Sequence, residues 1–123
     1  MVLTNTTLNV DSWVAVGRGN GTVGNVSSLT LYNSRLRCGA FSMGYNAGLG
    51  NLASQTLTLN NSTFTDYGDL NIAESSGSSA AVYLNGTSTL TTPNRFLLGL
   101  STDSTGTVVI ADSAALTNIP RAV

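Results

Sequence analysis

The sequence has little charge and lacks two residue types on which many polar sites depend. Charged residues make up 9% of the 123 positions, well below the roughly 25% of an ordinary soluble domain. All five basic residues are arginines, so lysine and histidine are both absent, and the formal net charge is −1. This composition provides no basic surface for nucleic acid. It also provides no lysine or histidine to activate a nucleophilic side chain.

Cysteine and long apolar runs are equally scarce. Cys38 is the single cysteine, so no disulfide forms within the chain, and we interpret it as a small apolar residue near the core. No stretch reaches the 18 or so apolar residues of a membrane helix. The polar segment Thr4-Asn5-Thr6-Thr7 follows Val2-Leu3 at once, which is not the pattern of a signal peptide. We therefore expect no membrane-spanning segment.

Apart from the 41% of residues that are hydrophobic, the uncharged positions hold mostly Thr, Ser, Asn and Gly. This mixture disfavours helices and favours strands joined by turns. Four landmarks then recur in fixed order: an apolar strand closed by a small residue, a Gly/Ser/Asn-rich connection, a second alternating strand, and a turn before one more apolar residue. One complete copy runs from Phe41-Ser42-Met43-Gly44 through Leu57-Thr58-Leu59 to Asn61-Ser62-Thr63-Phe64.

Equivalent positions recur at intervals of 28, 25 and 26 residues, from Leu31 to Leu59, Leu84 and Ile110. Units this short cannot bury an apolar face alone, but stacked units can. The repeat predicts an all-β fold, a right-handed parallel β-helix (β-solenoid) of about four rungs, with roughly 26–28 residues and three short strands in each rung. A β-sandwich or barrel also has many short strands, but neither requires one unit to recur in phase.

We expect one β-solenoid domain over residues 1–123 that begins in the middle of a rung, with rungs at approximately 9–36, 37–64, 65–90 and 91–116. The repeat places like residues in columns. The core columns contain Leu31, Leu59, Leu84 and Ile110; Phe41, Leu70 and Phe96; and Leu36, Phe64 and Leu90. A turn column contains Asn5, Asn33, Asn61, Gly86 and Asp112, followed by a hydroxyl column of Thr6, Ser34, Ser62, Thr87 and Ser113. Asn, Asp and Gly tolerate left-handed backbone, and hydroxyls bond nearby amides.

The unit V-G-x-G-x-G-x-x-G-x-V-x-x-L-T-L-x-x-S, from Val16 to Ser34, resembles the β-strand repeats of bacterial autotransporter passenger domains. It is equally similar to repeats of secreted proteins of the PEP-CTERM type. The resemblance spans nearly the whole chain and implies a right-handed parallel β-helix on a cell surface. It carries no shared catalytic residues. The chain shows neither the capping segments nor the C-terminal barrel of such passengers.

Two patterns invite a chemical interpretation. Gly19 to Gly24 matches G-x-G-x-x-G, but a strand pattern follows where dinucleotide binding needs a helix, so we interpret it as a solenoid loop. Polysaccharide-degrading β-helices use clustered carboxylates with Arg or Lys, and Asp66 and Asp69 are the only close acidic pair. Stacking places Asp69 and Arg95 in one column about 4.8 Å apart, which favours an exposed salt bridge over a catalytic pair.

Two functions remain open from the sequence. The first is a structural, extracellular fibre, stalk or adhesin whose partner is a second copy or the flanking rungs of a longer chain, with end-to-end contacts at Met1, Leu3, Leu116 and Val123. The second is a carbohydrate-binding or polysaccharide-degrading module that contacts a surface polysaccharide, using exposed aromatics such as Trp13, Tyr32, Tyr45, Tyr67 and Tyr83. We expect no enzyme activity, no catalytic residue, and no cofactor or metal.

Overall fold

In the computed structural model, the residues that can be described are 1–19, 26–45 and 54–119. These ranges contain strands and no helix, and they form a parallel β-solenoid of about four turns. The predicted fold class is confirmed. The strands are β1 (Val2–Thr4), β2 (Thr7–Val16), β3 (Val26–Tyr32), β4 (Arg35–Met43), β5 (Ser54–Asn60), β6 (Thr63–Asp66), β7 (Leu70–Ile72), β8 (Ser79–Asn85), β9 (Thr89–Thr92), β10 (Phe96–Leu98), β11 (Thr105–Ile110) and β12 (Ala115–Asn118).

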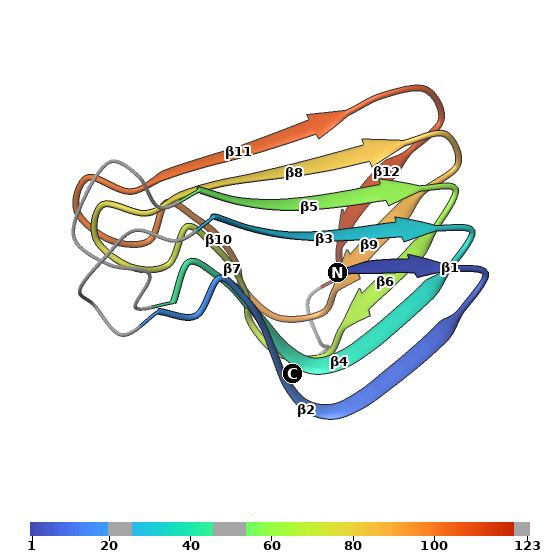
Figure 1. The fold of residues 1–123 in the computed structure, drawn as a ribbon, viewed down its shortest axis with the longest axis horizontal. Coiled ribbons are helices and arrows are strands. Elements are labelled where there is room, and N and C mark those ends of the chain that lie inside the picture. The colour runs from blue at the N-terminus through green and yellow to red at the C-terminus, as the bar shows by residue number, and fades with distance from the viewer. Residues whose placement is uncertain (20–25, 46–53, 120–123) are drawn as a thin grey trace.

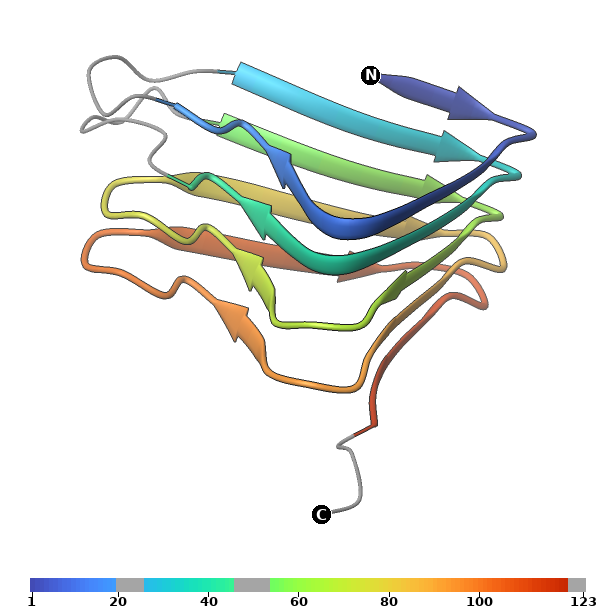
Figure 2. The ribbon, with the colours of Figure 1, turned by 90° about the horizontal axis from the view of Figure 1, so that it is seen from below.

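The chain winds round a roughly triangular cross-section, and its strands stack from rung to rung (Figures 1 and 2). One side is a sheet with the strand order β1-β3-β5-β8-β11. The other two sides belong to a single sheet, because the long strand β4 pairs with β6 through its first half and with β7 through its second half. Every pairing between these strands is parallel, as expected when each rung repeats the path of the one before it.

Residues that occupy equivalent positions in the sequence repeat are paired between neighbouring rungs of the structure. Leu31 pairs with Leu59, and Leu59 with Leu84. Phe41 pairs with Leu70, which pairs with Phe96 on the far side. These inward positions are fully buried in the middle rungs, and the rings of Phe41 and Phe64 meet edge to face with centroids 4.8 Å apart. In the last strand of the first sheet, Ile110 pairs with Leu84 but remains 49% exposed.

The turn between the two sheets forms the first corner of the triangle. Its turn column has left-handed backbone throughout, at Asn5 (φ 51°), Asn33 (47°), Asn61 (49°), Gly86 (66°) and Asp112 (59°). Only Gly, Asn and Asp adopt this region readily, which explains the composition of the column. The Asn61 side-chain oxygen also accepts a hydrogen bond from the Thr87 amide at 3.1 Å.

A ladder of buried hydroxyls follows this turn, and we name the region around Thr6, Ser34, Ser62 and Ser88 the serine corner. The amides of Thr6, Ser34 and Ser62 donate to the hydroxyl of the next residue in the ladder, at 3.1, 3.0 and 3.1 Å. Each serine hydroxyl donates in turn to a carbonyl of its own rung, at 2.6–2.8 Å. Each serine hydroxyl is thus both acceptor and donor, and no buried amide of these steps lacks a partner.

Two residues of the aligned hydroxyl column, Thr87 and Ser113, were wrong. The ladder continues from Ser62 to Ser88, not to Thr87, because Thr63 pairs with Thr89. The turn from Asn85 to Thr89 is one residue longer than its counterpart, and the extra residue is accommodated before the ladder position. Ser113 is also outside the ladder, since Ala115 pairs with Thr89 and Ala114 therefore follows Ser88 in the column.

Candidate functional site

Asp66, Asp69 and Arg95 are the group that most resembles the carboxylate sets of carbohydrate-active β-helices. The structure gives the two carboxyls different surroundings. Asp66 ends β6 and is fully buried, whereas Asp69 lies on the surface just before β7. The two acids therefore do not form a pair of solvent-open carboxyls on either side of a sugar.

Asp69 and Arg95 form the expected ion pair on the outside of the solenoid. The two residues are neighbours in one column, since Arg95 precedes Phe96, Asp69 precedes Leu70, and the Leu70 amide donates to the Arg95 carbonyl at 2.9 Å. The Arg95 guanidinium donates to Asp69 Oδ2 through Nη2 and, at 3.1 Å, through Nε. These hydrogen bonds lower the pKa of Asp69 and leave its carboxylate engaged.

Asp66 lies inside the solenoid next to Cys38, its partner in the register between β4 and β6. The Cys38 thiol and the Gly68 amide donate to Asp66 Oδ1, at 3.6 and 3.3 Å, while Oδ2 is buried without a hydrogen-bond partner among the described residues. Burial raises the pKa of Asp66. Burial, together with the charge of Asp66, also raises the pKa of Cys38, so this thiol is a buried apolar group and not an activated nucleophile.

The bend between the two sides of the second sheet is a second corner, and we name it the glycine corner after Gly39 and Gly68. A Cβ atom on Gly68 would lie 2.3 Å from the Gly39 carbonyl oxygen, and one on Gly39 would lie 2.9 Å from the Asp11 carbonyl oxygen. The rungs can therefore turn this closely only without side chains at these positions. The register between β2 and β4 shifts here, with Asp11 and Ser12 bulging outward.

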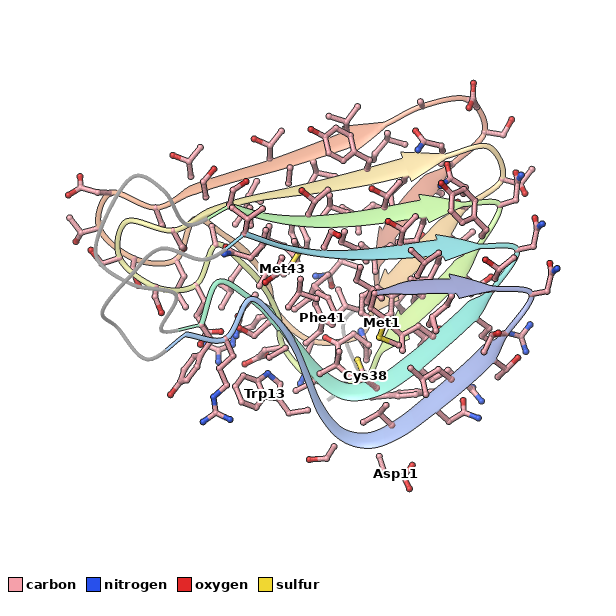
Figure 3. The ribbon with its side chains drawn as sticks, viewed as in Figure 1. Met1, Asp11, Trp13, Cys38, Phe41 and Met43 are labelled. Atoms are coloured by element: carbon pink, nitrogen blue, oxygen red, sulfur yellow. The ribbon has the colours of Figure 1, made fainter. Side chains whose placement is uncertain are left out.

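A hollow of about 430 Å³, which we call the corner hollow, opens beside the glycine corner. Its lining combines an amide, a carboxylate, a guanidinium and a phenol, and the full set is Asn9, Val10, Asp11, Arg37, Cys38, Gly39 and Tyr67. The Arg37 guanidinium donates to the Tyr67 hydroxyl at 2.6 Å and lies 5.6 Å from the centre of its ring. Figure 3 shows Asp11 at the outer edge of this corner and Cys38 inside it.

A second guanidinium–aromatic group lies on the adjoining outer side, beyond the bend in β2 and β4. Trp13 and Tyr45 meet edge to face with centroids 5.2 Å apart, and Arg18 lies 5.0 Å from the Trp13 ring and 5.7 Å from the Tyr45 ring. Trp13 pairs in register with Ala40, the residue after Gly39, so this group adjoins the glycine corner. In Figure 3, Trp13 lies outside the wall whose inner side carries Phe41 and Met43.

The sequence pointed to the aromatic residues of this region but not to the arginines that bind them. The signal was available, because Arg37 and Tyr67 are 30 residues apart, close to one repeat. Tyr32 and Tyr83 belong instead to the first sheet, away from this corner. The glycine pattern from Gly19 to Gly24 falls mostly on residues 20–25, and it lies, like Val123, outside the described residues.

Among the described residues, three or more potential metal ligands are nowhere gathered together, and none of the secondary structure is a helix able to cross a bilayer. Comparisons with known protein families, with curated proteins and with solved structures found no match to this chain.

Proposed function

We propose that this chain is a structural β-solenoid unit of an extracellular bacterial surface fibre, stalk or adhesin. The observation that carries the proposal is the in-register repetition of every layer along one axis. Apolar columns, left-handed turns and buried hydroxyls each recur at the same place in successive rungs. A fold built in this way gives length and stiffness, and each added rung continues the same contacts.

The outermost described strands are suited to receive a further rung, either from a second copy or from flanking parts of a longer passenger. β1 and β11 are the edges of the first sheet, and edge strands present unpaired backbone groups that pair with another strand. A hollow of about 520 Å³ opens beside β1, lined by Met1, Val14, Ala15, Val16, Gly17, Val26, Ser27, Ser28 and Leu29. At the opposite end, Leu98 and Ile110 are about half exposed.

The distribution of charge favours stacking in one direction. Residues 1–65 carry Arg18, Arg35 and Arg37 against Asp11, a net charge of +2. Residues 66–123 carry two arginines against five acids, a net charge of −3. The sum is the formal charge of −1, so the N-terminal half of the sequence is positive and the C-terminal half negative. Contact between unlike ends is heterologous, which produces a filament and not a closed ring.

The test is assembly of the chain, measured by light scattering over a range of concentrations and by negative-stain electron microscopy. We expect concentration-dependent filaments that weaken as salt screens the charge. Ile110→Lys places a charge at the outer edge and should leave monomers, whereas Tyr83→Lys, an equally polar change on the side of the sheet, should still assemble. A monodisperse monomer at all concentrations would contradict end-to-end assembly, and equal behaviour of the two variants would contradict this end as the contact.

A further inference from the structure

We propose that the outer side of the glycine corner binds an acidic polysaccharide, a polymer of uronic-acid type. In this site Arg37 and Arg18 bind sugar carboxylates, while Tyr67 and Trp13 pack against the faces of the sugar rings. The proposal goes beyond the structural function, since a fibre needs no such site.

The arginines are the first argument. In the described part of the chain, the only guanidinium–carboxylate ion pair is that of Arg95 with Asp69. Arg18 and Arg37 are exposed and lie instead against aromatic rings. A ring orients the planar guanidinium and leaves N–H groups at its edge to bind a carboxylate in bidentate geometry. Stacked arginines near one corner are therefore oriented for anions.

The aromatic side chains are the second argument. Trp13, Tyr45 and Tyr67 keep 36%, 40% and 42% of their surface exposed, although the solenoid interior beside them is well packed. Each offers an apolar face and a polar edge, the combination that suits a ligand with both C–H faces and hydroxyl groups. They occur on neighbouring rungs along the two sides that meet at the glycine corner, which distinguishes them from scattered surface aromatics.

The corner hollow is the third argument. Its volume of about 430 Å³ lies within the range of small-molecule sites, roughly 300–1,000 Å³. Gly39 contributes no side chain to its lining. Asn9 and Asp11 add planar groups that can accept hydrogen bonds from sugar hydroxyls, so hydroxyls should lie at Asp11 and the carboxylate at Arg37.

Electrostatics supports a polyanion at this place. The first 65 residues carry the net charge of +2 derived above, and both stacked arginines belong to them. The negative charge of Asp11 repels an anion bound at this corner, and this provides a second test of the site. Its removal should strengthen binding of an acidic polymer, because a repulsive charge is lost while the arginines remain.

The experiment is a titration of the folded chain with polygalacturonate, followed by the fluorescence of Trp13. This residue is the single tryptophan, so the signal comes from the site alone. We expect a saturable change with polygalacturonate and none with neutral dextran. Arg37→Gln should weaken binding at least fivefold. Arg35→Gln, which removes the same charge from an exposed residue of the same strand outside the hollow, should weaken it less than twofold.

Asp11→Asn should strengthen binding about twofold or more. Circular dichroism and thermal unfolding of each variant establish that it is folded, which surface substitutions of this kind should allow. Absence of saturable binding, equal binding of dextran, or equal losses in Arg35→Gln and Arg37→Gln would each overturn the proposal, the last because it indicates only diffuse charge attraction. None of these results bears on filament assembly, which is measured without polysaccharide.

Discussion

The serine corner and the glycine corner turn the chain by opposite means. At the serine corner, left-handed Asn, Gly and Asp residues make the turn, and the hydroxyls of Ser34, Ser62 and Ser88 satisfy the amides of neighbouring rungs. At the glycine corner, the turn depends on missing side chains, and one oxygen of the buried Asp66 carboxyl has no hydrogen-bond partner in the part of the chain that the structure describes.

The difference lies in how completely each corner satisfies its polar groups. The serine corner repeats with little variation and has every ladder group paired, as expected of a region selected for stacking. The glycine corner varies from rung to rung, bulges at Asp11, and exposes aromatic and guanidinium groups. Buried polar groups that lack partners reduce stability, so the glycine corner contributes less to the stability of the stack than the serine corner.

The largest expected effect is at the glycine corner. Gly68→Ala should destabilise the fold by about 3 kcal/mol, since the new methyl group meets the Gly39 carbonyl oxygen and the backbone must shift. Gly106→Ala is the comparison and should cost less, because the shortest contacts of the methyl group there are with the Leu98 side chain, and the nearest backbone atom, the Gly99 nitrogen, lies 3.0 Å away. Chemical denaturation of both variants measures the difference. Equal losses would mean that close contact of the rungs does not define this corner.

The serine corner should lose somewhat less from a single change. Ser62→Ala removes the acceptor for the Ser34 amide and leaves that buried group without a partner, a cost of about 2 kcal/mol. Thr87→Ala, at the exposed position next to the ladder, should change stability only slightly. Unfolding free energies of the two variants test this, and a larger loss for Thr87→Ala would show that the ladder runs through the wrong residue.

A third change should stabilise the protein. Because burial raises the pKa of Asp66, the protonated acid favours the folded state. That contribution is complete below the unfolded pKa of about 3.9 and is lost as the pH rises through the folded pKa. Asp66→Asn should therefore add about 1 kcal/mol at pH 7.5 and little at pH 3.5. Thermal unfolding across this pH range tests the sign, and a variant less stable than the wild type at pH 7.5 would contradict it.

The smallest effect should come from the surface ion pair. Arg95→Gln should leave the unfolding temperature at neutral pH almost unchanged, because exposed pairs contribute little. It should raise the pKa of Asp69, which Arg95 lowers. In the wild type the contribution of Asp69 is present above its unfolded pKa and is lost as the pH falls through the folded value. Carboxyl titration by NMR detects the change, and an unaltered Asp69 titration curve would speak against the pairing.

Much of the fold followed from the sequence because, in stacked rungs, residues one repeat apart in the sequence lie in contact. The Leu31, Leu59 and Leu84 column and the Asn and Asp turn positions needed only alignment. The longer turn before Ser88 misled the alignment, since no sequence feature marks which of two turn residues is extra. Asp66 was considered only as one member of an acidic pair, although alternation from the inward Phe64 places it inside. The pairing of Arg37 with Tyr67 depends on a corner whose geometry two glycines determine.

The direction of the hydrogen bonds has a mechanical consequence. The ladder bonds join groups 28, 28 and 26 residues apart in sequence, and they run from rung to rung along the axis together with the backbone bonds of the sheets. Tension applied to the two ends of the chain therefore peels one rung at a time. Each rung contributes about 4.8 Å to the folded length but releases roughly 90–100 Å of extended chain. A solenoid of such rungs unfolds in steps and lengthens about twentyfold before the extended covalent backbone resists further stretching.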